Sequence, residues 1–220
     1  MSIPKIIHQI WLGDQSKRPS EIMKTWQDKH PEWEYILWTE ENLPEIKNKK
    51  QFDEMEELAG KADILRYELL FNQGGIYIDA DTVCVNPIDS YMLKNDSFSH
   101  WENEYFIPGL IHNGHIGSCI KNELMSKLVE HIGNQDKIYY GPLNAWKVTG
   151  PVLISNMVKH LRYTKLRIYP SYYFIPKHYS GVEHYYSNDK IYGHHLNGST
   201  PQSEFNYGDP NESEIIKNVS

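Results

Sequence analysis

Cysteine is scarce in this sequence: Cys84 and Cys119 are the only two among 220 residues. Two cysteines cannot build a disulfide framework, and their spacing does not form the Cys-X-X-Cys motif of redox or zinc sites. We therefore expect both side chains to pack as small apolar groups rather than to act as catalytic thiols.

Long apolar runs are missing as well. No uninterrupted run approaches the roughly 18 residues of a membrane-spanning helix, and the amino terminus lacks the basic segment and apolar stretch of an export signal. The sequence predicts neither export nor a transmembrane segment. We expect a cytoplasmic protein whose only contact with a membrane is peripheral, and only if its substrate is linked to a lipid.

An excess of basic residues is also absent. The chain has 22 Lys and Arg against 29 Asp and Glu, a net charge of −7, which argues against nucleic acid as a partner. No Pro/Gly/Ser-rich linker, internal repeat or low-complexity run divides the chain. We predict one domain over residues 1–200 and a polar, loosely held tail over residues 201–220.

What the chain does contain is an alternation of strand-like and helical patterns. The spacing of apolar residues predicts helices over residues 19–30, 57–72 and 124–132. Runs typical of strands lie at residues 5–11, 35–38, 76–80, 109–112 and 166–169. Such alternation predicts an α/β domain with a mainly parallel central sheet.

Two carboxylates end the third of these strand-like runs. In an extended chain Tyr77, Asp79 and Asp81 share one face, so both carboxylates point the same way. Like charges roughly 7 Å apart repel unless a cation lies between them, and a hard divalent ion with oxygen ligands fits that need. The pattern predicts a metal site at the tip of the strand.

The helix before this strand carries Asp63 and Arg66. Their three-residue spacing is that of an ordinary ion pair on a helix surface, which contributes little to stability. The helix leads through Gly74 and Gly75 directly into the strand, however, so the pair can reach the cleft that holds Asp79. Ligands of open α/β sheets collect at the carboxyl ends of strands, where Trp11 and Asn113 are also expected.

At these residues the chain resembles a known family. The segments Asp-Ile-Leu-Arg-Tyr (63–67) and Gly-Gly-Ile-Tyr-Ile-Asp-Ala-Asp (74–81) resemble the core signature of the Asp-X-Asp-containing glycosyltransferases of family 32. The opening residues 3–13, the Thr-Gly-Pro turn at 149–151, and His194-His195 with Ser199 are also similar to family segments. Thr200 departs from the family, which usually has Trp there.

The resemblance implies a GT-A type nucleotide-sugar-binding fold, a single Rossmann-like domain. It implies that Asp63 and Arg66 bind sugar hydroxyls, that Asp79 contacts ribose and sugar, and that Asp81 binds metal. Trp11 can stack on the base, although ordinary core packing is the alternative. The donor-binding residues implied in this way are Ile10, Trp11, Asp63, Arg66, Tyr77, Asp79, Ala80, Asn113, Gly114, His195 and Ser199.

We therefore expect a metal-dependent, retaining glycosyltransferase. It would move a hexose from a nucleotide sugar to a hydroxyl of a glycan or glycoconjugate, with a UDP-sugar favoured over GDP-mannose as donor. Mn²⁺ or Mg²⁺ would stabilise the departing diphosphate. The predicted catalytic residues are Asp63, Arg66, Asp79 and Asp81, and the predicted metal ligands are Asp79, Asp81 and His195.

Two alternatives stay open. Asp79 and Asp81 after an apolar strand also resemble the nucleophile strand of haloacid-dehalogenase-type phosphatases, in which the first Asp attacks phosphorus. That motif usually opens a chain, and the downstream acidic pair that would hold magnesium is missing here. The second alternative is a carbohydrate-binding or nucleotide-sugar-binding module that keeps the fold without turnover.

Overall fold

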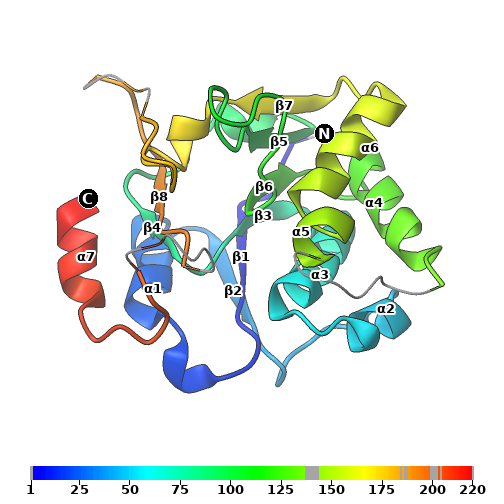
Figure 1. The fold of residues 1–220 in the computed structure, drawn as a ribbon, viewed down its shortest axis with the longest axis horizontal. Helices are drawn as coiled ribbons and strands as arrows, with labels where there is room; N and C mark the ends of the chain where they lie inside the picture. Colours follow the sequence, from blue (N-terminus) through cyan, green and yellow to red (C-terminus); the bar gives the residue numbers. More distant parts are fainter. Residues whose placement is uncertain are drawn as a thin grey trace.

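The structure, a computed structural model, describes residues 2–136, 144–183, 185, 188–198, 203 and 205–219. Its centre is a six-stranded sheet (Figure 1). The strand order is β2 (Glu34–Trp38), β1 (Ile6–Ile10), β3 (Gly75–Ile78), β6 (His115–Ser118), β5 (Ser97–His100), β7 (Leu166–Tyr169). Strand β6 runs antiparallel to both neighbours, and the other pairings are parallel. The predicted α/β fold is confirmed.

A second, two-stranded sheet lies beside the first. It pairs β4 (Thr82–Cys84) with β8 (Gly193–His195) in antiparallel fashion, with Thr82 opposite His195. Because β4 follows β3 after a short turn, this small sheet carries the late segment of the chain to the end of β3. Segments more than 110 residues apart in the sequence therefore meet at Thr82 and His195.

Helices cover both faces of the central sheet (Figure 1). One layer contains α2 (Lys49–Glu54), α3 (Leu58–Gln73), α4 (Glu123–Gly133), α5 (Asn144–Val148) and α6 (Pro151–Leu161). The other contains α1 (Ser20–Lys29) and α7 (Glu212–Val219). Three short 3-10 turns connect these elements: η1 (Gln15–Lys17), η2 (Met92–Lys94) and η3 (Ser171–Tyr173). The predicted helices over residues 19–30, 57–72 and 124–132 are confirmed.

Side chains of β3 point alternately towards the two helix layers. Ile76 and Ile78 pack with Trp26 of α1 in one core, whereas Tyr77 packs on the side of α3 with Leu65. The turn from α3 into β3 requires glycine, since Gly75 has φ +96 and a Cβ there would lie 2.7 Å from the carbonyl oxygen of Ile6. Tyr77 is thus held against the helix that carries Asp63 and Arg66.

Two strand predictions need correction. Residues 109–112 are not a strand: Ile111 makes only an isolated bridge to Trp101, and the strand at this point is β6. Strand β6 holds a single β-branched residue, and its Gly117 lies so close to Phe98 that a Cβ there would collide with a ring carbon. Tertiary packing rather than propensity therefore makes it a strand. Strand β3 ends at Ile78, two residues earlier than predicted.

The tail also differs from the expectation of a loosely held segment. Helix α7 packs Ile215, Ile216 and Val219 against the core that contains Ile22. The Glu212 carboxylate accepts hydrogen bonds from the N–H groups of Glu21 and Ile22, at 2.9 and 3.3 Å. A carboxylate is favourable at a helix N-terminus, so this contact fastens α7 to α1.

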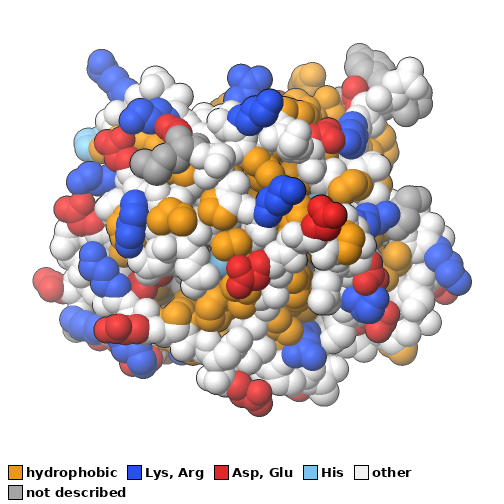
Figure 2. Space-filling view, turned by 180° about the vertical axis from the view of Figure 1, so that it is seen from behind, with side chains coloured by type: hydrophobic (Ala, Val, Ile, Leu, Met, Phe, Trp, Pro, Cys, Tyr) orange, Lys and Arg blue, Asp and Glu red, His pale blue; other side chains and the backbone are white. Residues whose placement is uncertain are grey.

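The surface combines charged and apolar areas. Figure 2 shows hydrophobic side chains gathered in the middle of one face, with acidic and basic side chains interspersed around them. Within the described ranges, no helix combines the length and the apolar character that crossing a bilayer requires.

Candidate active site

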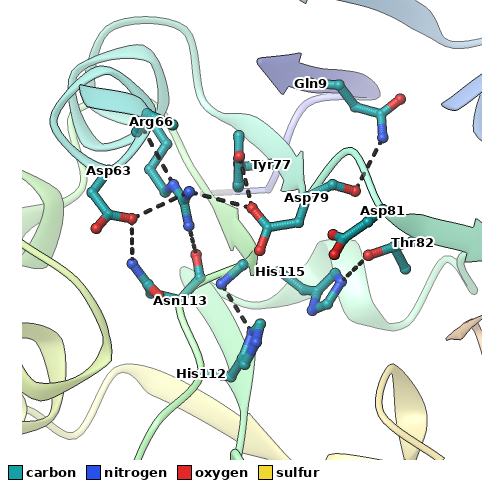
Figure 3. Close-up of polar contacts among 12 residues, drawn as sticks. Gln9, Asp63, Arg66, Tyr77, Asp79, Asp81, Thr82, His112, Asn113 and His115 are labelled. Atoms are coloured by element: carbon teal, nitrogen blue, oxygen red, sulfur yellow. Dashed lines mark hydrogen bonds and ion pairs between the residues drawn. The ribbon is translucent and has the colours of Figure 1, made fainter. Parts of the chain in front are cut away.

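The candidate site begins where β3 ends. Asp79 lies just past the strand, in a turn that the N–H of Thr82 closes on the Asp79 carbonyl oxygen at 3.2 Å. The prediction that the two aspartates share one continuous strand face is therefore wrong. The turn nevertheless brings them together. The Tyr77 hydroxyl donates to Oδ1 of Asp79 at 2.8 Å and orients its carboxylate (Figure 3).

Arg66 joins the helix to the strand tip. Its Nη2 lies 3.2 Å from Oδ1 of Asp63 and 3.3 Å from Oδ1 of Asp79, and its guanidinium carbon lies 4.1 Å from the centre of the Tyr77 ring. Its Nη1 donates to the Asn113 carbonyl oxygen (Figure 3). The side chains of Asp63 and Arg66 are only 7% and 5% exposed, so this is not the surface ion pair that the spacing alone allowed.

Asp63 has two further hydrogen-bond partners. Besides Arg66 it accepts hydrogen bonds from the Asn113 carboxamide at 2.8 Å and from the Thr149 hydroxyl at 2.9 Å. Burial raises the pKa of Asp63 to about 6, although Arg66 and the two hydrogen bonds oppose the rise. The carboxylate is therefore held in place by three elements of the fold.

The other half of the site surrounds Asp81. His195 Nε2 lies 3.1 Å from Oδ1 of Asp81 and 3.8 Å from Oδ2 of Asp79. The N–H of Gly198 donates to Oδ2 of Asp81 at 2.7 Å. Burial alone lowers the pKa of His195, but the two carboxylates outweigh it and raise the pKa to about 9. An imidazolium thus balances the charge of the aspartates in this structure.

The donor set around His195 fits a divalent ion. Carboxylate oxygens suit Mg²⁺ and Mn²⁺, and the imidazole nitrogen makes Mn²⁺ the better match. The Nδ1 atom of His195 is buried without a hydrogen-bond partner within the described residues. With a cation in place of the proton on Nε2, His195 would share it with the carboxylates of Asp79 and Asp81. Ligand atoms of Asp79, His112 and His195 also lie within 4.8 Å of one another, so His112 is a further candidate ligand.

Neighbouring histidines match a metal site by distance but not by hydrogen bonding. His100, His112 and His115 lie close enough together to hold an ion. However, His100 Nδ1 bonds the Trp101 carbonyl oxygen at 2.7 Å, and its Nε2 bonds Nδ1 of His115 at 2.9 Å. A carbonyl oxygen only accepts, so His100 carries its proton on Nδ1, and His115 donates from its own Nδ1.

The Thr82 hydroxyl then donates to Nε2 of His115 at 2.8 Å (Figure 3). Every nitrogen of His100 and His115 is used in this chain of hydrogen bonds, which leaves no lone pair for a metal. Burial holds the pKa of both rings below the usual value, in agreement with neutral imidazoles.

The remaining predicted residues lie around this centre in different ways. Gly114 must be glycine, because a Cβ there would collide with the Asp79 carboxylate. Trp11 is half-buried, follows β1 and contacts the Tyr207 ring. Ile10 and Ala80 are buried, 4% and 7% exposed. Ser199 lies outside the described residues.

Several residues of the site carry no signal in the sequence. Gln9 donates to the Asp79 carbonyl oxygen at 3.3 Å (Figure 3). The Tyr207 ring meets the Trp11 ring edge-on with centroids 5.1 Å apart, and its hydroxyl hydrogen-bonds Asp81. Thr149 lies in the Thr-Gly-Pro segment that resembles the family, but its hydrogen bond to Asp63 could not be predicted. These contacts join residues far apart in sequence, so spacing could not reveal them.

Comparison with known proteins decides the family. The family described as "glycosyltransferase sugar-binding region containing DXD motif" matches residues 16–98, the segment with Asp63, Arg66, Asp79 and Asp81. The chain carries this sugar-binding region. The family prediction from the sequence is thereby confirmed, and the matched Asp-X-Asp is Asp79-Ala80-Asp81.

Relatives and solved structures agree with this assignment. Inositol phosphoceramide mannosyltransferase 2 of Schizosaccharomyces pombe is 31% identical over 169 residues, which cover 70% of this chain and 45% of that protein. The chain thus spans less than half the length of this relative. The PaToxG glycosyltransferase has a TM-score of 0.58 at 17% identity, covering 73% of this chain and 69% of that one. The galactosyltransferase LgtC, solved with donor and acceptor sugar analogues, has a TM-score of 0.52 at 12% identity, covering 98% and 96%. These structures confirm the GT-A fold.

Proposed function

We propose that this chain is a metal-dependent glycosyltransferase that moves a hexose from a nucleotide sugar to a hydroxyl of a glycan or glycoconjugate, with retention at the sugar carbon. One observation carries the proposal: Asp79 contacts Arg66 at 3.3 Å on one side and His195 at 3.8 Å on the other. The sugar-binding pair and the metal-binding group are thus linked through a single carboxylate.

Each half has a distinct task in the transfer. Asp63 and Arg66 would hold the sugar through charge-assisted hydrogen bonds to its hydroxyls, in a buried position where such bonds are strong. Asp79, Asp81 and His195 would hold a divalent ion, which stabilises the negative charge that develops on the departing diphosphate. The half-buried Trp11 would stack on the base.

The identity of the sugar is the finer part of the proposal. The sequence favoured a UDP-sugar, whereas the similar fungal proteins are named mannosyltransferases. We therefore propose mannose as the transferred sugar and include GDP-mannose beside UDP-glucose, UDP-galactose and UDP-N-acetylglucosamine in the test.

The phosphatase alternative fits the geometry poorly. Its first aspartate must be free to attack phosphorus, yet the Asp79 carboxylate is shared by Tyr77, Arg66 and His195. The fold is that of glycosyltransferases. A binding module without turnover has the same geometry as the enzyme, so only an assay separates these two.

The test is the release of free nucleoside diphosphate from the four nucleotide sugars in the presence of Mn²⁺. We expect release from one of them, and its loss both with a metal chelator and in the Asp81→Asn variant. Binding of a nucleotide sugar without release would identify a module, and release of orthophosphate from a phosphoester would identify a phosphatase. Either result would refute the proposal.

A further inference from the structure

Next to the donor site, the loop of residues 101–111 presents an acidic and an aromatic side chain. The N–H of Glu102 donates to the Leu110 carbonyl oxygen at 2.8 Å, which closes the base of the loop. The Asn103 carboxamide oxygen accepts the N–H of Phe106 at 2.9 Å. These bonds fix the loop so that Glu102 points inward, with a side chain 11% exposed, while Phe106 is 50% exposed.

The Glu102 carboxylate lies between two imidazoles without bonding to either. Its Oε2 is 3.7 Å from Nε2 of His112, and its Oε1 is 3.6 Å from Nε2 of His178. Both distances exceed the 2.7–3.2 Å range that is typical of an N–H···O hydrogen bond. No described residue makes a hydrogen bond to this carboxylate. The group is therefore close to two partners and satisfied by neither.

The Nε2 atoms of both imidazoles face the carboxylate. His112 Nδ1 accepts the N–H of Gly114 at 2.9 Å, while His178 Nδ1 accepts the N–H of Ser180 at 3.2 Å and lies 2.6 Å from the Ser180 hydroxyl oxygen. A neutral imidazole that accepts at Nδ1 carries its proton on Nε2. Nε2 of His178 is buried and has no hydrogen-bond partner.

An unpaired buried donor is unfavourable. A hydroxyl group accepts from an N–H and donates to a carboxylate at once, so it fits beside Glu102 and His178 better than a cation or an anion does.

An exposed aromatic ring contacts one of these imidazoles. The Phe106 ring contacts the His178 ring, with centroids 5.3 Å apart, and meets Tyr179 edge-on at 6.1 Å. A pyranose offers a face of C–H groups that packs on an aromatic ring and a rim of hydroxyls that needs polar partners. An anionic membrane surface would be matched by basic side chains instead of a carboxylate.

This arrangement continues into the donor site. The His112 ring meets the His195 ring edge-on with centroids 5.2 Å apart, so a single imidazole separates Glu102 from the proposed metal ligands. We propose that Phe106 and Glu102, backed by the buried His178, form the subsite for the acceptor sugar, with Phe106 packing on the ring and the Glu102 carboxylate accepting from its hydroxyls. The inference rests on the proposed function, because it requires a donor site beside it.

The test measures binding of simple sugars to the full chain. Methyl α-mannoside, methyl α-glucoside and methyl β-galactoside are titrated by saturation-transfer NMR in the presence of Mg²⁺ and nucleoside diphosphate. We expect at least one to bind, with a dissociation constant raised at least about fivefold by Phe106→Ala and about tenfold by Glu102→Gln. Nucleoside diphosphate affinity, measured by calorimetry, should stay unchanged in both variants.

Ile120→Ala is the matched control. Ile120 is 44% exposed and lies beside Gly74, at the other end of β3, so its loss should leave sugar binding unchanged. The inference is overturned if no glycoside binds the wild type, or if the Phe106 and Ile120 variants behave alike. It is also overturned if Phe106→Ala weakens only binding to phosphatidylcholine and phosphatidylglycerol vesicles. Failure of the proposed function is a separate result, the absence of nucleoside diphosphate release by the wild type from any of the four nucleotide sugars.

Discussion

The imidazole of His195 lies 3.1 Å from the carboxylate of Asp81. Each depends on the other for charge balance, since His195 lowers the pKa of Asp81 against the opposing effect of burial. If the proposed divalent ion binds His195 through Nε2, it displaces a proton from that nitrogen, so metal binding should release a proton.

The first prediction concerns Asp81→Asn. The amide keeps an oxygen for the Gly198 N–H but removes the anionic metal ligand, so transfer in Mn²⁺ should fall at least about a hundredfold. The pKa of His195 should fall from about 9 towards its ordinary value, because one of two carboxylates is lost. Activity assays and an NMR titration of the His195 ring measure the two effects. Near-normal transfer would contradict the metal assignment.

Arg66→Ala should lower the free energy of unfolding by about 3–5 kcal/mol, because it leaves Asp63 and Asp79 without their cation in a largely buried site. Lys127→Ala is the control: Lys127 and Glu130 have the same i, i+3 spacing, but their side chains are 46% and 55% exposed. A surface pair of that kind contributes about 0–1 kcal/mol. Urea unfolding compares the two, and equal losses would refute the buried-pair interpretation.

Asp63→Asn separates the sugar from the nucleotide. The substitution keeps the shape of the side chain but weakens a charge-assisted hydrogen bond to a sugar hydroxyl, so transfer should fall at least about tenfold. Binding of the bare nucleoside diphosphate should hardly change, since it offers no sugar to contact. Turnover and calorimetry give the two values, and equal losses for both ligands would show that α3 does not bind the sugar.

Trp11→Ala should weaken nucleotide binding by about 1–3 kcal/mol if the ring stacks on the base. Tyr207→Phe is the matched control, since it keeps the edge-on contact with Trp11 and removes only the hydroxyl that bonds Asp81. Nucleoside monophosphate binding without metal should therefore change in the first variant and not in the second. Unfolding of Trp11→Ala, with normal binding by the folded fraction, would make Trp11 a core residue.

The pH dependence of stability follows from the buried histidines. Burial lowers the pKa of His8 to about 4 and that of His100 to about 3. Between pH 6.5 and these values the unfolded chain binds more protons than the folded one, so stability falls as pH falls. His8 alone should account for about 2 kcal/mol between pH 6.5 and pH 5.

Asp63 has the opposite effect on the pH dependence of stability. Its raised pKa stabilises the folded state at low pH, and this contribution is lost as the pH rises towards 6. Urea unfolding at pH 7 and pH 5 tests the balance. In His8→Gln, which cannot take up the proton in either state, the decrease between the two values should be smaller. An equal decrease would show that His8 does not contribute.

The sequence predicted elements whose apolar pattern is regular. Helix α3 and strands β1 and β2 agree with the prediction to within about two residues, because apolar spacing and the Gly74-Gly75 turn define them locally. Strand β6 was missed because contact with Phe98, not its own propensity, makes it a strand. Helix α7 was missed because its apolar face needs Ile22, some 190 residues away, to be recognised as buried.

The candidate site follows the same division. Asp63, Arg66, Tyr77 and Asp79 lie within one helix–turn–strand unit, so their meeting could be predicted from spacing. The contacts of Thr149 with Asp63 and of Tyr207 with Asp81 depend on how distant segments fold back. The burial of Arg66 could not be predicted from residue spacing either, because an i, i+3 pair has the same spacing on an exposed helix face as on a buried one.

The contact of Glu212 with α1 bears on the order in which the site assembles during protein synthesis. Trp11 leaves the ribosome long before Tyr207 and Glu212 do. A nascent chain can form the helix and strand around Asp79 as soon as they emerge, but it lacks the Tyr207 contact with Asp81 until that later segment has also emerged. The proposed donor site is therefore completed after the helix and strand that carry Asp63 and Asp79, and a chain cut before residue 205 would have to bind nucleotide without Tyr207.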